Sequence, residues 1–237
     1  MNEKMKGIVT VFVDIDDTLW WFTENSKLAL RHTFDAFDIS SVCTYERFKE
    51  VYLKKNLELW NLYHHGLIDK DFLVNERFRF TLKECGYKGD VEKMCHLLDE
   101  EYLRFLALQP TTIPGARQLL EYLVTKGYDV NTLSNGFQGT QQQKLISGGL
   151  SDLIHRNVLS DDCGITKPQR GIFDYALEQC GADAATSVMI GDNADADIKG
   201  AHDAGWRTIY FNIRGLDPIE GTADAVVTSL DEIQQIL

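Results

Sequence analysis

Hydrophobic residues near the start of the chain form an unbroken run that ends at acidic side chains. The run over residues 9–13 is β-branched and aromatic, and Asp14 and Asp16 follow it. An apolar run without alternation is typical of a strand buried on both faces of a parallel sheet. The carboxyl ends of such strands are where open α/β sheets bind ligands. Because side chains at i and i+2 of extended backbone point the same way, Asp14 and Asp16 can share one ion.

The pattern becomes helical over residues 24–108. Apolar residues recur there at spacings of three and four, and strand signals are absent. Breaks near 38–44, 66–69 and 86–90 predict a bundle of about four helices.

From residue 110 onward, strand and helix patterns alternate. Candidate strands cover 128–133, 154–159, 187–190, 208–211 and 225–227, and candidate helices cover 115–126, 138–147, 169–180, 196–204 and 230–236. Such alternation favours a parallel sheet with helices on both faces. We therefore predict an α/β fold: a doubly wound, Rossmann-like core (1–19 and 109–237) with an all-helical cap (20–108) inserted after the first strand.

Composition narrows the class of protein. The formal net charge is −12, with 44% hydrophobic and 25% charged residues. This charge disfavours nucleic acid polymers and anionic membranes and favours a small-molecule partner. No apolar stretch approaches the roughly 20 residues of a membrane span. The five scattered cysteines indicate reduced thiols. We expect a cytoplasmic protein that is a monomer or a weak dimer.

Polar residues stand at four strand-end sites. They are Asp14 to Thr18, Ser134-Asn135-Gly136, the Thr166-Lys167-Pro168 loop, and Gly191-Asp192 with Asp197. Taken singly, turn chemistry or complementation of a helix dipole explains most of them. Three carboxylates from these sites, if they met about 4 Å from one another, would repel by roughly 4 kcal/mol per pair at an effective dielectric constant of about 20. A divalent cation with oxygen ligands, such as Mg²⁺, relieves that repulsion.

The order of the four sites resembles the haloacid dehalogenase superfamily pattern of DxDxT, then S/T, then K, then GDxxxxD. The resemblance implies Asp14 as nucleophile, Asp16 as general acid and base, and Ser134, the Asn135 N–H and Lys167 around the phosphoryl group. It implies Mg²⁺ held by Asp14, the backbone carbonyl of Asp16, and Asp192. Asp197 would support Lys167 or the metal shell, and Thr18 would order the turn. Asp17 replaces a glycine that is frequent in the superfamily.

The resemblance also bears on substrate. Dehalogenase relatives lack the second acid, so Asp16 favours phosphate ester hydrolysis through an aspartyl-phosphate. Leu133 to Phe137 with Gln141 and Gln142, and Lys167-Pro168 with residues 172–179, are most similar to bacterial pyrimidine 5'-nucleotidases. Acylneuraminate-9-phosphate and phosphoglycolate types of phosphatase remain alternatives. A phosphomutase or a non-enzymatic acidic binding module is a further alternative.

Aromatic and histidine residues in and near the cap are candidates for contacting a planar substrate group. Trp20, Trp21, Trp60 and Tyr63 could stack on a base, and His64 with His65 could ligate a metal. At helical spacing such side chains are more often part of a core.

Overall fold

The computed structural model describes residues 4–237, and the chain divides into two compact units. One unit contains the chain up to Phe22 together with Pro110–Leu237, and the other contains Thr23–Gln109. We describe each unit by itself.

The first unit is built on a six-stranded sheet in the order β3-β2-β1-β4-β5-β6, in which all neighbours are parallel. The strands are β1 (Thr10–Val13), β2 (Asp129–Ser134), β3 (Arg156–Leu159), β4 (Ser187–Gly191), β5 (Arg207–Phe211) and β6 (Ala225–Val227). Each predicted strand is present, and most ends differ by one or two residues. The α/β fold class predicted from the sequence is therefore confirmed.

The central position of β1 explains its apolar sequence. Val13 lies opposite Thr132 of β2 and Ile190 of β4, so β1 has a strand on each side. All four residues of β1 are buried. On one face of the sheet, Phe12 and Met189 belong to an apolar cluster with Phe173. Polar side chains at the end of β1 thus emerge from the middle of the sheet.

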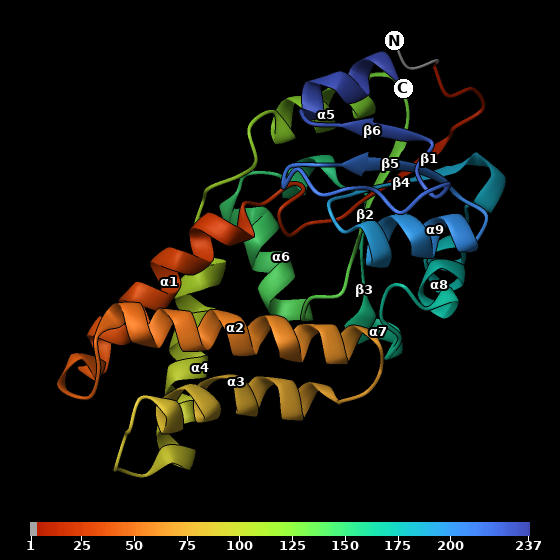
Figure 1. The fold of residues 1–237 in the computed structure, drawn as a ribbon. Helices are drawn as coiled ribbons and strands as arrows, with labels where there is room; N and C mark the ends of the chain where they lie inside the picture. The colour runs from red at the N-terminus through yellow and green to blue at the C-terminus, as the bar shows by residue number, and fades with distance from the viewer. Residues whose placement is uncertain (1–3) are drawn as a thin grey trace. The chain divides into compact units, whose positions relative to one another are not determined.

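Helices cover both faces of this sheet (Figure 1). They are α5 (Ala116–Thr125), α6 (Gln138–Ser147), α7 (Ser160–Cys163), α8 (Arg170–Cys180) and α9 (Gly200–Asp203). The core cluster takes in residues of α8 and α9, whereas α5 packs with β2 and the C-terminal segment.

Two predicted helices are not α-helical. The predicted helix over 196–204 is a π-helical segment, Ala194–Lys199, followed by α9. The Asn193 side chain accepts from the N–H groups of Asp195 and Ala196, and the Ile198 N–H reaches the Asn193 carbonyl at 3.3 Å, which is i→i+5 spacing. The predicted helix over 230–236 is the 3₁₀ segment Leu230–Gln235.

The second unit contains the predicted helices. They are α1 (Phe22–Ala36, which begins at the last residue of the first unit), α2 (Tyr45–His64), α3 (Lys70–Glu84) and α4 (Val91–Ala107). Thr44, Asp69 and Asp90 cap α2, α3 and α4 by accepting a backbone N–H three residues on. These capping residues account for the predicted breaks.

The interior of the second unit holds an ion pair that the sequence did not predict. Arg77 donates from Nε to Asp99 Oδ1 at 2.6 Å, and both side chains are buried. The aromatic rings of Tyr52, Phe78 and Tyr102 pack against one another beside it. Removing one partner of such a pair would leave an uncompensated buried charge.

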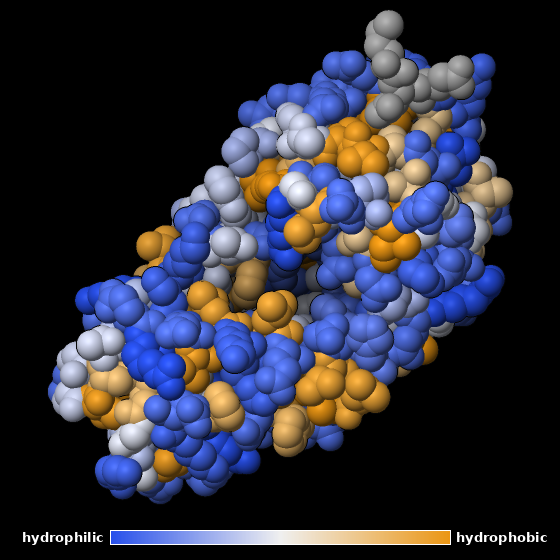
Figure 2. Space-filling view, in the orientation of Figure 1, coloured by the Kyte–Doolittle hydropathy of each residue, from blue (hydrophilic) through white to orange (hydrophobic). Residues whose placement is uncertain are grey.

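Polar residues predominate on the face of the molecule in view in Figure 2. Figure 2 shows mostly hydrophilic residues on the face in view, with apolar residues in separate groups among them. Among the described residues, no helix has the length and apolar character needed to cross a membrane.

Candidate active site

The parallel register brings the predicted site residues to one edge of the sheet. Asp14 directly follows β1, Ser134 is the last residue of β2, and Asp192 directly follows β4. Because Val13 pairs with both Thr132 and Ile190, these three strands end level with one another. Lys167 reaches the same edge from the loop between α7 and α8.

Lys167 is the central charge of this site. Its ammonium group lies 2.7 Å from Asp14 Oδ1 and 2.7 Å from Asp197 Oδ1. It also donates to the Leu133 carbonyl at 2.6 Å. All three ammonium hydrogens therefore have acceptors, although the side chain is 98% buried. Asp197 contacts Lys167, and support of Lys167 is one of the two roles that the sequence left open for Asp197.

Burial strongly perturbs the ionisable groups of the site. Burial raises the pKa of Asp14 from 3.8 to about 7, against the opposing effect of Lys167, whose charge is shared with Asp197. The pKa of Asp192 is raised well above its usual value, chiefly by burial. Burial alone would lower the pKa of Lys167, but Asp14 and Asp197 together raise it. The negative charge of these buried acids is only partly compensated by Lys167, so a further positive charge would stabilise the site.

Three buried carboxylates have the geometry of a cation site. Asp14, Asp192 and Asp197 each offer an oxygen, and these oxygens lie within 4.8 Å of one another. Oxygen ligands of this kind suit Mg²⁺. Among residues 4–237, these three side chains form the group of acidic, histidine or cysteine residues whose ligand atoms lie this close together. His64 and His65 therefore do not join a metal-binding group, and the Asp16 side chain lies outside it.

The Asn135 side chain holds the lysine loop. Its Nδ2 donates to the Lys167 carbonyl at 2.9 Å, and its Oδ1 accepts from the Lys167 N–H at 2.7 Å. Sequence reasoning considered the backbone N–H of Asn135 and did not foresee this pair of hydrogen bonds. They connect the turn after β2 to the loop that carries Lys167.

Asp16 points to helix α6 rather than to the other acids. Lys144 Nζ lies 2.7 Å from Asp16 Oδ1, and Gln141 Nε2 donates to Asp16 Oδ2 at 3.0 Å. Lys144 is 97% buried, with its ammonium group 4.8 Å from the centre of the Trp20 ring. Trp20 is itself fully buried. Sequence reasoning missed Lys144, whose buried face on α6 gave no local signal.

Asp17 has a partner that lies almost two hundred residues away in the chain. Arg214 Nη2 donates to Asp17 Oδ2 at 2.9 Å and lies 2.8 Å from Asp192 Oδ2, a contact with the distance of an ion pair but not the angle of a hydrogen bond. Asp17 has a φ of 58°, in the left-handed region. Glycine adopts that region without strain, which explains why a glycine suits this position. Arg214 offsets the charge that Asp17 adds.

Thr18 contributes to the turn after β1 through its backbone. The Thr18 hydroxyl is fully buried and has no hydrogen-bond partner among the described residues, whereas the Thr18 N–H closes the turn on the Ile15 carbonyl at 3.4 Å.

Trp60 packs with Tyr63 and His64 at ring-centre distances of 5.7 and 5.6 Å.

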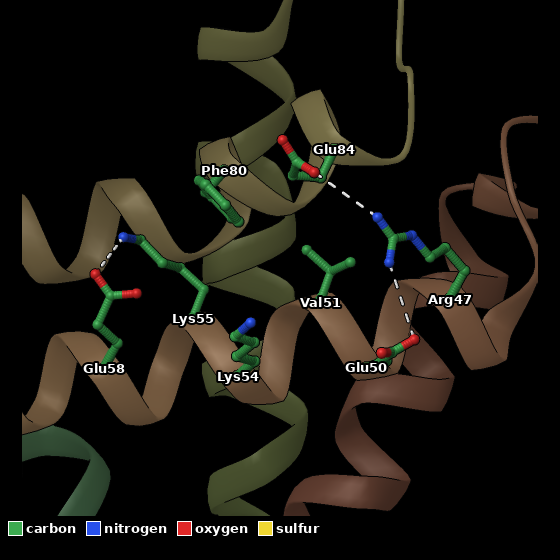
Figure 3. Close-up of a pocket in the computed structure, with 8 residues that line it drawn as sticks. All are labelled: Arg47, Glu50, Val51, Lys54, Lys55, Glu58, Phe80 and Glu84. Atoms are coloured by element: carbon green, nitrogen blue, oxygen red, sulfur yellow. Dashed lines mark hydrogen bonds and ion pairs between the residues drawn. The ribbon is translucent and has the colours of Figure 1, made fainter.

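A surface pocket on the second unit is a separate feature (Figure 3). It has a volume of about 170 Å³ and lies along α2 and α3. Its lining residues are Arg47, Glu50, Val51, Lys54, Lys55, Glu58, Phe80 and Glu84. Arg47 pairs with Glu50 and Glu84, and Lys55 pairs with Glu58 at 2.8 Å, so most of the lining charges are compensated within the pocket.

A parallel sheet that brings an acid, a hydroxyl, a lysine and an acid cluster to one edge defines a hydrolase of the haloacid dehalogenase type. The family model described as haloacid dehalogenase-like hydrolase matches residues 8–205. The chain belongs to this family.

The comparisons also identify individual relatives. The chain is 34% identical over 229 residues to pyrimidine 5'-nucleotidase YjjG of Escherichia coli, covering 96% of each protein. It is 30% identical to pyrimidine 5'-nucleotidase PynA of Streptococcus pneumoniae, covering 86% of this chain and 84% of the relative. The magnesium-bound crystal structure of the HAD-hydrolase YfnB from Bacillus subtilis matches with a TM-score of 0.87 and 31% identity, over 98% of this chain and 99% of that one.

The raised pKa of Asp14 predicts how stability depends on pH without metal. Between the unfolded value of 3.8 and about 7, folded Asp14 binds a proton that the unfolded chain releases. The free energy of unfolding contributed by this group therefore falls as pH rises through that window. Urea denaturation in chelator at pH 5 and pH 7.5 should show that the free energy of unfolding falls less between these two pH values for Asp14→Asn than for the parent protein. Equal losses would mean that Asp14 does not carry the effect.

Proposed function

We propose that this protein is a Mg²⁺-dependent phosphomonoester hydrolase that works through an aspartyl-phosphate and acts on nucleoside 5'-monophosphates. The observation that carries the proposal is the Asp14 carboxylate, held by Lys167 at 2.7 Å at the end of the central strand. Ser134 and the acid cluster with Asp192 lie at the same edge of the sheet. The names of the relatives YjjG and PynA support the choice of nucleotides.

In the first step, an Asp14 carboxylate oxygen attacks phosphorus and the bond from phosphorus to the leaving oxygen breaks. The leaving oxygen takes a proton from the Asp16 carboxyl group. The Ser134 hydroxyl and the ammonium group of Lys167 offset charge on the phosphoryl oxygens.

In the second step, water attacks the phosphorus of the acyl phosphate, and the bond between phosphorus and Asp14 breaks. Asp16 takes the proton from that water and inorganic phosphate leaves. The carboxylate of Asp16, held by Lys144 and Gln141, is in the form that this step needs. Asp14 is then free for another turnover.

The donor set fits a bound Mg²⁺. Asp14 and Asp192, with the backbone carbonyl of Asp16, are the proposed ligands, and Asp197 is a fourth candidate because its oxygen lies within the same 4.8 Å group. A bound Mg²⁺ would neutralise the acids and draw charge from the phosphoryl oxygens. Asp197 also contacts Lys167, so we assign it a supporting role.

We expect Asp14→Asn to abolish turnover while leaving the fold intact, because the amide is a poor nucleophile of similar shape. The loss in kcat should exceed about a hundredfold, equivalent to about 2.7 kcal/mol of transition-state stabilisation. Steady-state kinetics with Mg²⁺ would measure it, and circular dichroism would verify folding. A folded variant that keeps more than a hundredth of the parent kcat would rule out the covalent role.

Chelation should remove activity, and added Mg²⁺ should restore it. Ca²⁺ should bind but support poor turnover, since it prefers looser and higher coordination. The control is a metal titration followed by thermal denaturation, which reports binding independently of turnover. Full activity in excess chelator would exclude a metal from the mechanism.

The substrate class is tested by kcat/KM for UMP and dTMP against acylneuraminate 9-phosphate, phosphoglycolate and glucose phosphates. We expect the pyrimidine nucleotides to be hydrolysed fastest and nucleic acid polymers not to be hydrolysed. A tenfold preference for a non-nucleotide, equivalent to about 1.4 kcal/mol, would overturn the nucleotidase proposal and leave the phosphatase proposal standing.

A further inference from the structure

We infer that Gln141 is a positioning residue that makes the Ser134 hydroxyl a hydrogen-bond donor to the phosphoryl group. The inference rests on the proposed function, because it assigns the hydroxyl a phosphoryl ligand. It concerns one fully buried side chain on α6 that touches two of the proposed site residues.

The amide nitrogen of Gln141 contacts both neighbours. Nε2 lies 2.6 Å from Ser134 Oγ and 3.0 Å from Asp16 Oδ2. A side-chain amide nitrogen carries two hydrogens, so each contact uses one. Asp16 Oδ2 already accepts from Lys144 Nζ, so it faces the amide of Gln141 as an acceptor, and this fixes the orientation of the amide with nitrogen toward the site. Lys144, one helical turn along, keeps Asp16 in place by donating to both of its oxygens at 2.7 and 2.9 Å.

The acceptor positions of the Ser134 oxygen are consequently both filled. Gln141 Nε2 occupies one, and the N–H of Gly136 donates to the other at 3.2 Å. A serine hydroxyl has two acceptor positions and one hydrogen. The hydrogen must take the remaining direction, and no hydrogen bond from Ser134 to a described residue uses it. Ser134 is thus set to donate rather than to accept.

The surroundings show that Gln141 is closely fitted to this position. It is fully buried, and its own Oε1 is buried without a hydrogen-bond partner among the described residues. A buried amide oxygen without a partner costs stability, so this side chain is not placed there for stability alone. A Cβ at Gly136 would overlap the end of the Gln141 side chain, so a larger residue there would have to displace Gln141.

A double-mutant cycle tests the inference in the Mg²⁺-loaded enzyme. The variants are Gln141→Met, which keeps length but cannot donate, Ser134→Ala, and the two combined. Gln143→Met is the matched control, since Gln143 lies on the same helix and its side chain, within the described part of the chain, donates to Ser147 Oγ at 3.0 Å and to no site residue. The readouts are kcat, KM, the dissociation constant of vanadate as a phosphoryl mimic, and the melting temperature.

We expect Gln141→Met to lower kcat and weaken vanadate binding about tenfold, equivalent to about 1.4 kcal/mol, with KM changed less than about twofold. In the Ser134→Ala background the same substitution should have less than about a threefold effect, because the hydroxyl it orients is gone. Gln143→Met should match the parent in kcat. If Gln141→Met fails to fold, Gln141→Leu also cannot donate and should lower kcat in the same way.

Other outcomes overturn the inference in distinguishable ways. A full tenfold effect in both backgrounds would mean that Gln141 acts independently of Ser134. An unchanged kcat for Gln141→Met, or an increase, in a parent enzyme that hydrolyses phosphate esters would refute the inference and leave the proposed function intact. A parent that neither hydrolyses phosphate esters nor binds vanadate would refute both.

Discussion

The shared ammonium group of Lys167 is the interaction on which the site depends. It contacts Asp14, Asp197 and the Leu133 carbonyl at distances from 2.6 to 2.7 Å in a nearly water-free position. Two buried carboxylates so close together repel each other, and one cation between them offsets only part of that repulsion. The pKa of Asp14 therefore remains raised, and the negative charge of the acid cluster is only partly compensated. The same arrangement of charges supports the proposal that the site binds a cation and an anionic substrate.

The sequence predicted the sheet and the strand-end residues for physical reasons that are local. An apolar run such as 9–13 is stable only between two other strands, so its central position follows from composition alone. Parallel strands end at one edge, and this brings Asp14, Ser134 and Asp192 together without knowledge of any long-range contact. The capping acids Asp69 and Asp90 likewise marked the helix breaks, because an N-cap hydrogen bond spans only three residues.

The residues that sequence reasoning missed make contacts between distant segments. Lys144 lies in an α6 pattern that is typical of a solvated helix face, yet it is buried against Asp16, more than a hundred residues earlier. The sequence singled out Gln141 only for the family resemblance, and its contact with Asp16 was not foreseen. Arg214 lies in an irregular segment with no periodicity at all. The π-helical segment at Ala194–Lys199 depends on how Asn193 caps the turn, which hydrophobic periodicity does not encode. Such features require the tertiary arrangement to be known.

The pairing of Asp17 with Arg214 gives the site two electrically different sides. The side chain of Arg214 is 50% exposed, whereas the side chain of Lys167 is 2% exposed. Dissolved ions screen exposed charges within about 10 Å at 0.1 M salt and screen buried pairs far less. Ionic strength can therefore weaken the hold of Arg214 on Asp17 and Asp192 while the pairs made by Lys167 stay intact. The salt concentration of the medium therefore affects the Arg214 side of the site and leaves the buried Lys167 side unaffected.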